Sequence, residues 1–202
     1  MKRKKQKKQM KRKLKNLVHK MVIALALPQF VFAAGLHGVT LPDSDKVDGK
    51  SLVLNGLGTR LASFLGFKVK VYVAGLYVEK KSKKAEDIST SDSPKKIVME
   101  FLRDVSKEKI TKSWEEAFEN NCKDKCSSHQ VHLKKFISLM KEMKEKDRMT
   151  LVFHTDRLEL TQEGVLPETI SNAEFSDIIL SIFIGPNPPN AELRDGLLGT
   201  NS

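Results

Sequence analysis

The chain has 202 residues, 40% apolar and 30% charged, the composition of an ordinary globular protein long enough to bury one core. Its formal net charge of +11 would suit a nucleic-acid-binding protein, but residues 1–20 hold eleven of the basic residues and no acidic one. The other 25 basic residues are balanced by 25 acidic ones, which excludes a broadly basic domain and predicts no nucleic-acid partner.

Residues 1–33 have the organisation of a signal peptide. The basic stretch ends at Lys20, an uncharged apolar stretch follows, and it closes with Val31-Phe32-Ala33 before Ala34-Gly35, which has the pattern of a small-residue cleavage site. The apolar stretch is well short of the roughly 20 residues that a membrane-spanning helix needs. We expect cleavage after Ala33, export to a bacterial periplasm, and no stable membrane anchor on the mature chain. A basic nucleic-acid-binding tail and an uncleaved anchor are the alternatives.

The next segment, residues 34–50, carries chain breakers at positions 42–45, so we expect a linker that leads into the domain. From Ser51 to Glu79 the pattern is that of strands, because valines at 69, 71 and 73 alternate with polar or mixed positions. We therefore place one folded domain at residues 51–200.

A hydrophilic turn from Lys80 to Pro94 precedes a buried strand at Ile97 to Leu102. Near Ser106 the apolar period changes from two to that of a helix. We interpret the apolar face of this helix as core rather than as a ligand site; its residues are Ile110, Trp114, Ala117 and Phe118.

A second helix is predicted to run to about Lys146, with Leu133, Phe136, Ile137 and Met140 on one face. Two strands, Met149–His154 and Arg157–Thr161, are predicted to form a hairpin. Strands, helices, strands and again helices in succession indicate an α+β fold.

The last long helix has the clearest boundaries. Ser171 and Glu174 have the spacing of a capping box, and Gly185-Pro186 ends the helix. Most positions between them are apolar, so this helix is either buried or borders a cavity. A short helix at Ala191–Leu198 closes the chain.

Cys122 and Cys126 are the only cysteines and lie in a polar segment. In an oxidising compartment two such neighbours most often pair, so we favour a disulfide. Free thiols are one alternative. A zinc site with His129 and His132 is another, although this spacing matches no established ligand pattern.

No nucleophile elbow, zinc-protease motif or phosphate-binding loop is present. One pair of residues has a spacing that suggests a binding site. If Leu65-Gly66-Phe67 is a tight turn, Arg60 lies opposite Tyr72 on the neighbouring strand, and both side chains point to the same face. A guanidinium beside a phenol can hold a carboxylate, because the guanidinium can bind both oxygens and the phenol adds a donor. An ordinary surface pair is the alternative.

Several segments together carry a resemblance to a known family. They are Leu54 to Arg60, Phe67 to Val78, Lys96 to Ser106, Trp114 to Phe118 and Ser181 to Pro186. In this order, and over about residues 50–198, they resemble the chalcone isomerase-like family. The resemblance implies an open-faced β-sandwich, in which a large antiparallel sheet is covered by a layer of helices with the ligand cleft between them.

The resemblance also implies what the site could do. Enzymes of the family cyclise a chalcone with an Arg, two Thr or Ser, a Tyr and an Asn. Arg60 matches the Arg, but the first Thr position is Tyr72 here. The Tyr would fall near Lys107–Thr111 and the Asn near Trp114–Glu116, and neither is matched.

An Arg with a Tyr at the start of the cleft is similar to the non-catalytic, fatty-acid-binding members. The predicted function is therefore binding of a small hydrophobic or fatty-acid-like carboxylate, without catalysis and without a cofactor. Arg60 and Tyr72 would hold the carboxylate. A haem-binding protein of the same fold and a chalcone isomerase-type lyase are the alternatives. The predicted wall for the ligand's tail is the last long helix, through Phe175, Ile179 and Ile182.

Overall fold

The structure is a computed structural model, and it describes residues 33–64 and 66–201. Residues 1–32, most of the predicted signal peptide, lie outside the described residues. Within the described part no helix is both long enough and apolar enough to cross a membrane.

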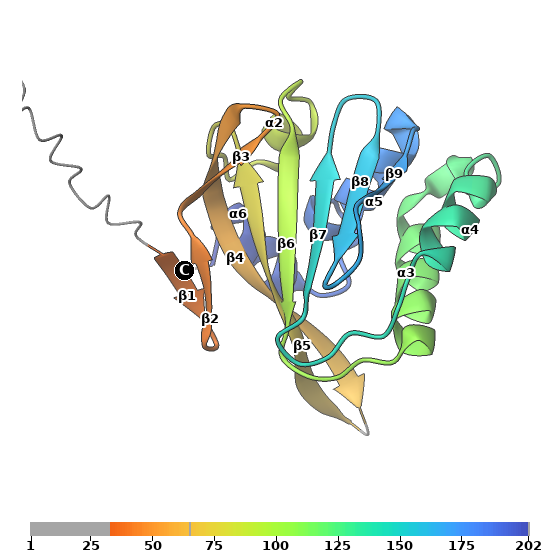
Figure 1. Cartoon of the computed structure of the whole chain (residues 1–202), viewed down its shortest axis with the longest axis horizontal. Helices are drawn as coiled ribbons and strands as arrows, with labels where there is room; N and C mark the ends of the chain where they lie inside the picture. The colour runs from red at the N-terminus through yellow and green to blue at the C-terminus, as the bar shows by residue number, and fades with distance from the viewer. Residues whose placement is uncertain (1–32, 65, 202) are drawn as a thin grey trace, which may run out of the picture. The chain divides into compact units, whose positions relative to one another are not determined.

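Seven strands form one antiparallel sheet in which neighbours in the chain are neighbours in the sheet (Figure 1). The helices pack on one face of this sheet, so the predicted α+β fold with a helix-covered antiparallel sheet is confirmed. The strands are β3 (Ser44–Val47), β4 (Lys50–Phe64), β5 (Phe67–Val78), β6 (Lys95–Phe101), β7 (Arg148–Phe153), β8 (Leu158–Gln162) and β9 (Glu168–Ile170). The helices are α2 (Ala85–Ser89), α3 (Lys107–Asn121), α4 (Gln130–Ser138), α5 (Ala173–Ile184) and α6 (Ala191–Leu198).

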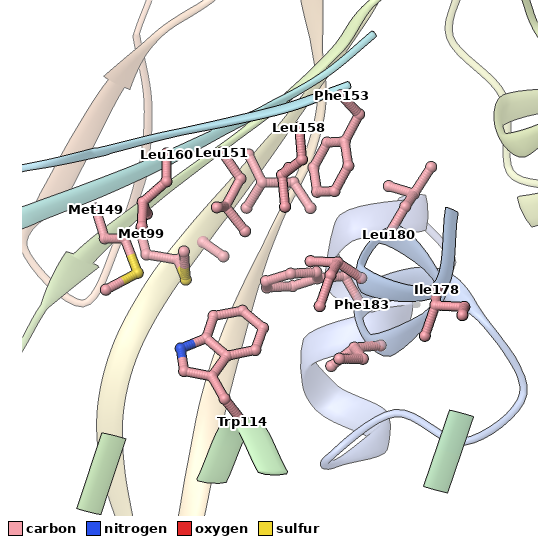
Figure 2. Packing of buried hydrophobic residues seen from close by; sticks show 14 of the residues in the cluster. Met99, Trp114, Met149, Leu151, Phe153, Leu158, Leu160, Ile178, Leu180 and Phe183 are labelled. Atoms are coloured by element: carbon pink, nitrogen blue, oxygen red, sulfur yellow. The ribbon is translucent and has the colours of Figure 1, made fainter. Parts of the chain in front are cut away.

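The main core lies between the sheet and the helices. Alternate residues of β5, β6, β7 and β8 point into it, as the period of two requires. Trp114 of α3 belongs to this core, with ring centroids 4.9 Å from Phe136 and 5.9 Å from Phe183. Figure 2 shows the Trp114 ring extending from α3 toward the sulfur-bearing ends of Met99 and Met149 on the sheet.

A second, smaller core lies on the opposite face of the sheet. The hairpin of β1 (Ala33–Leu36) and β2 (Val39–Pro42) buries Val39 and Leu41 there. The hydroxyl of Tyr77 in β5 donates a hydrogen bond to the carbonyl oxygen of Pro42 at 2.9 Å.

The prediction of a linker at residues 34–50 is therefore wrong, because this segment forms β1, β2 and β3. Its apolar residues alternate over only four positions, as in Val39 and Leu41, which is too short a pattern to stand out among chain breakers. The breakers at positions 42–45 lie mostly in strands, because Pro42 ends β2 and Ser44 begins β3, and the turns fall at glycines instead. Gly38 and Gly49 have φ values of 84° and 77°, which glycine adopts without steric cost.

Two helix boundaries differ from the prediction. Helix α4 ends at Ser138, and the chain beyond it extends to pair Met143 with Val105, so Met140 and Met143 are buried without being helical. Helix α5 is capped by Asn172, whose side chain accepts a hydrogen bond from the Phe175 N–H at 2.8 Å. Glu174 does not complete a capping box with Ser171, because its carboxylate pairs with Lys125 and His129 instead.

Cys122 and Cys126 form a disulfide in this structure, with Cα atoms 4.9 Å apart. The bond joins the end of α3 to the short turn that leads to α4. Because each sulfur is bonded to the other, neither can serve as a free thiol or a zinc ligand. No group of three or more His, Cys, Asp or Glu side chains suited to a metal occurs among the described residues.

Helix α6 packs on strand β4 through glycines. A Cβ atom at Gly56 or Gly58 would overlap backbone atoms of α6, and one at Gly196 would overlap the backbone of β4. This close approach fixes α6, and with it the chain segment before α6, against the strand that carries Arg60.

The substitution Gly58→Ala should lower the free energy of unfolding by about 2–3 kcal/mol, because the added methyl group meets rigid backbone. Gly35→Ala is the matched control, since its nearest neighbours are 3.6 Å and 3.9 Å away, at ordinary contact distance. Denaturant unfolding measures both changes. Equal changes in the two variants would show that the contact of α6 with β4 is not tight.

Candidate ligand-binding site

Arg60 of β4 and Tyr72 of β5 are directly paired across the antiparallel ladder. Near the turn the register pairs Phe64 with Phe67 and Leu61 with Lys70. In that register Arg60 would oppose Val71. A shift of one residue between Leu61 and Arg60 leaves Val71 as an extra residue, and Arg60 then meets Tyr72. The predicted pair is thus reached through a bulge, and not through the three-residue turn assumed from the sequence.

A cavity of about 430 Å³ lies beside this pair, between the sheet and α3. Small-molecule sites in proteins typically have roughly this volume, about 300–1,000 Å³. Arg60 and Tyr72 both line it. Its floor consists of buried apolar residues: Met99, Phe101, Ile110, Trp114, Met149 and Ile182.

Asn190, in the segment between α5 and α6, positions Arg60. Its side-chain oxygen accepts a hydrogen bond from the backbone N–H of Leu61 at 3.1 Å and lies 3.5 Å from the Arg60 guanidinium. Its side-chain nitrogen donates to the carbonyl oxygen of Thr59 at 2.9 Å. The guanidinium also donates to the carbonyl oxygen of Leu61. These partners are neutral, so the positive charge of Arg60 is still available to an anion.

Tyr72 packs against Phe101, its partner on β6, with ring centroids 5.5 Å apart. Burial raises the pKa of Tyr72 to about 12, and the nearby charge of Arg60 partly opposes this rise. Near neutral pH the phenol is therefore uncharged and can donate a hydrogen bond into the cavity.

The mouth of the cavity is defined by its exposed lining residues and carries both charges. The basic ones are Arg103, Lys109 and Lys112, and the acidic ones are Asp104 and Glu116. Each acid has a basic neighbour: Glu116 lies 3.7 Å from Lys112, and Asp104 lies 3.5 Å from Lys144. Together with Arg60, the lining therefore has more positive than negative charge, which favours an anionic ligand.

The predicted cavity wall on α5 is largely wrong. Ile182 lines the cavity, but Phe175 and Ile179 do not. Phe175 is fully buried against Phe118 and Phe136, with ring centroids 5.9 Å and 6.0 Å away. Helix α5 is apolar on most sides because other helices and the sheet surround it.

The wall is supplied instead by α3, whose apolar face the sequence predicts to be core alone. Ile110 and Trp114 line the cavity, whereas Phe118, one turn further along, is core. The helical period identifies this face but does not tell which part of it meets solvent-accessible space.

None of the histidines in the described part of the chain lines this cavity. His129 and His132 lie instead beside Phe175 in the helical layer. The haem alternative therefore has no histidine ligand among the described lining residues. A further cavity of about 320 Å³ lies near α2, contains neither Arg60 nor Tyr72, and is lined largely by polar and charged residues.

A family model described as chalcone isomerase-like matches residues 33–199. The chain belongs to the chalcone isomerase-like family. The match begins at β1, which agrees with the finding that residues 34–50 are part of the folded domain.

Among solved structures, the chain is similar to a fatty-acid binding protein of Arabidopsis thaliana. The TM-score is 0.68 at 19% sequence identity, and the match covers 84% of this chain and 97% of the other. At this identity the likeness shows a shared chalcone isomerase-like fold. A search of curated protein sequences finds no match.

The chain's two tyrosines should both resist ionisation in the folded state, because the pKa values of Tyr72 and Tyr77 are each raised to about 12 from an ordinary value of 10.0. The unfolded chain ionises first, so this contribution to stability is complete below pH 10 and is lost as the pH rises toward 12. Ultraviolet absorbance of tyrosinate follows the ionisation.

The variant Arg60→Ala should raise the pKa of Tyr72 further, since the charge that lowers it is gone. Tyr77→Phe isolates the Tyr72 signal. A Tyr72 that ionises at its ordinary pKa in the folded protein would contradict the burial described here.

Proposed function

We propose that this chalcone isomerase-like protein binds a fatty-acid-like carboxylate in the cavity between the sheet and α3, and does not transform it. The observation that carries the proposal is the pairing of Arg60 with Tyr72 beside an apolar floor. This is the arrangement of a ligand site that is mostly apolar, with a few fixed polar groups.

The carboxylate would lie at Arg60 and Tyr72. The guanidinium offers charge-assisted hydrogen bonds in a fixed fork, and the uncharged phenol offers one more donor. Asn190 holds the Arg60 backbone and side chain in place, so less side-chain freedom is lost on binding.

The tail would lie on the apolar floor beside Trp114, Met99 and Met149. Each methylene removed from water contributes about 0.8 kcal/mol, so a chain of several carbons adds substantial affinity. The unbranched methionine side chains can adapt to chains of different shape.

Two further observations support binding without catalysis. Tyr72 stands where the resemblance expects a catalytic Thr, and the family's Tyr and Asn positions are unmatched. A protein of this fold from Arabidopsis thaliana is a fatty-acid binding protein. Export through the leader at residues 1–33 is part of the same proposal.

The variant Arg60→Ala should weaken binding of dodecanoic acid by about 10- to 100-fold, because a hydrogen bond to a charged group contributes about 1.5–3 kcal/mol. Isothermal titration measures the affinity. Methyl dodecanoate is the matched control ligand: it lacks the carboxylate, so its affinity should not depend on Arg60. Equal affinity of the acid for the native and variant proteins would refute the proposed carboxylate site.

Trp114 is the chain's only tryptophan and lines the cavity, so it should report directly on the tail. A fatty acid brominated along its chain should quench the Trp114 fluorescence, and the same acid without bromine should compete the quenching away. Absence of quenching under conditions where titration shows binding would place the ligand elsewhere. Cyclisation of a chalcone by the protein, followed by ultraviolet absorbance, would contradict the non-catalytic part of the proposal.

A further inference from the structure

The β4–β5 hairpin extends beyond the rest of the sheet. Strand β6 pairs with β5 only from Tyr72 to Tyr77, so the part of β5 from Phe67 to Lys70 pairs with β4 alone. Figure 1 shows this two-stranded ribbon projecting past the end of the sheet, on the side where α3 begins.

The end of this ribbon exposes an aromatic side chain. Phe67 is 75% exposed and follows Gly66, whose φ of 82° belongs to the turn. Hairpin turns are ordinarily built from polar residues and glycine, and a large apolar side chain held in water at such a tip stabilises nothing in the fold. A single exposed apolar side chain needs no explanation on its own, as at Leu166, which is 83% exposed. Phe67 differs because it continues a larger apolar surface.

The ribbon leads from Phe67 to the cavity. Val69 and Val71 of β5 and Ala62 of β4 line the cavity, and the alternation of a strand puts Phe67 on the same side as Val69. Phe67 therefore stands at the outer end of an apolar path whose inner end is Tyr72. Whatever covers Phe67 lies against the mouth of the cavity.

Two basic side chains without an acidic partner stand beside this path. Arg103 and Lys109 line the mouth, and among the described residues neither forms an ion pair with a carboxylate. Arg103 also contacts the ribbon, because its guanidinium donates a hydrogen bond to the carbonyl oxygen of Lys70 at 2.8 Å. The amino group of Lys70 itself lies 3.1 Å from His37 in the β1–β2 turn, away from this path. An apolar tip with basic residues behind it matches the surface of an anionic bilayer, which offers hydrocarbon below a layer of negative charge.

We propose that the β4–β5 ribbon docks this protein on an anionic lipid bilayer, with Phe67 inserted between the lipids and Arg103 and Lys109 at the headgroups. Docking in this position brings the mouth of the cavity to the membrane. That this contact loads the cavity with a fatty-acid-like molecule rests on the proposed function, whereas the docking itself does not.

The test places a tryptophan at the ribbon tip of the full-length chain, as F67W combined with W114F so that no other tryptophan contributes. The control is L166W with W114F, because Leu166 is 83% exposed and lies in the turn between β8 and β9, outside the ribbon. Vesicles contain brominated phosphatidylcholine with or without phosphatidylglycerol. Both variants carry the same leader, so any membrane binding by residues 1–33 affects them equally.

We expect the tryptophan at position 67 to shift to shorter emission wavelengths and to be quenched by the vesicles that contain phosphatidylglycerol, and the one at position 166 to stay unquenched. Equal quenching at both positions, or none at position 67, would overturn the proposal. So would a shift at position 67 that depends on protein concentration without vesicles, which would indicate a second copy of the chain as the occupant.

A second measurement keeps the Trp114 side chain intact. F67S should lower the affinity for these vesicles by about tenfold relative to L166S, because one buried aromatic side chain is lost. It should also slow the transfer of dodecanoic acid out of the vesicles while leaving its affinity in solution unchanged. Arg60→Ala should weaken the binding of dodecanoic acid in solution and leave the affinity of the protein for the vesicles unchanged. A failure of docking and a failure of the carboxylate site therefore give different results.

Discussion

The pairing of Arg60 with Tyr72 depends on one extra residue in a strand. Val71 has no partner on β4. This extra residue shifts the register by one, so Arg60 pairs with Tyr72, whereas without the shift Arg60 would pair with Val71. The rest of the site is arranged around this bulge. Helix α6 is held against β4 by glycine contacts, and the segment before it supplies the Asn190 amide that fixes Arg60. The sheet thus forms the polar end of the cavity, and the Arg60 side chain there has little freedom of movement.

The helical layer provides the apolar end. Helix α3 has one apolar face, but its residues serve two purposes along its length: Ile110 and Trp114 reach into the cavity, and Phe118 completes the core with Phe175. Trp114 connects the two, since its ring contacts Phe136 and Phe183 in the core and also forms part of the cavity floor. A cavity bordered by a rigid aromatic core on one side and methionines on the other can keep its shape and still adapt to a ligand.

Much of the fold could be predicted from the sequence, because local periodicity identifies β5, β6, α3 and the β7–β8 hairpin. The site was predictable only in part. The spacing of Arg60 and Tyr72 led to the correct pair, although no local signal shows the bulge that makes it. Asn190 is 130 residues from Arg60, and no pattern within one segment can link positions so far apart. Phe175 and Ile110 have the same apolar periodicity, yet only packing determines that the first is enclosed by other helices and the second meets the cavity.

A crystal structure of this protein with dodecanoate tests the central claim most directly. We expect the carboxylate within hydrogen-bonding distance of both the Arg60 guanidinium and the Tyr72 hydroxyl, with the alkyl chain extending along Trp114. A carboxylate held by Lys109 and Lys112 at the mouth, with the chain pointing inward past an unengaged Arg60, would contradict it.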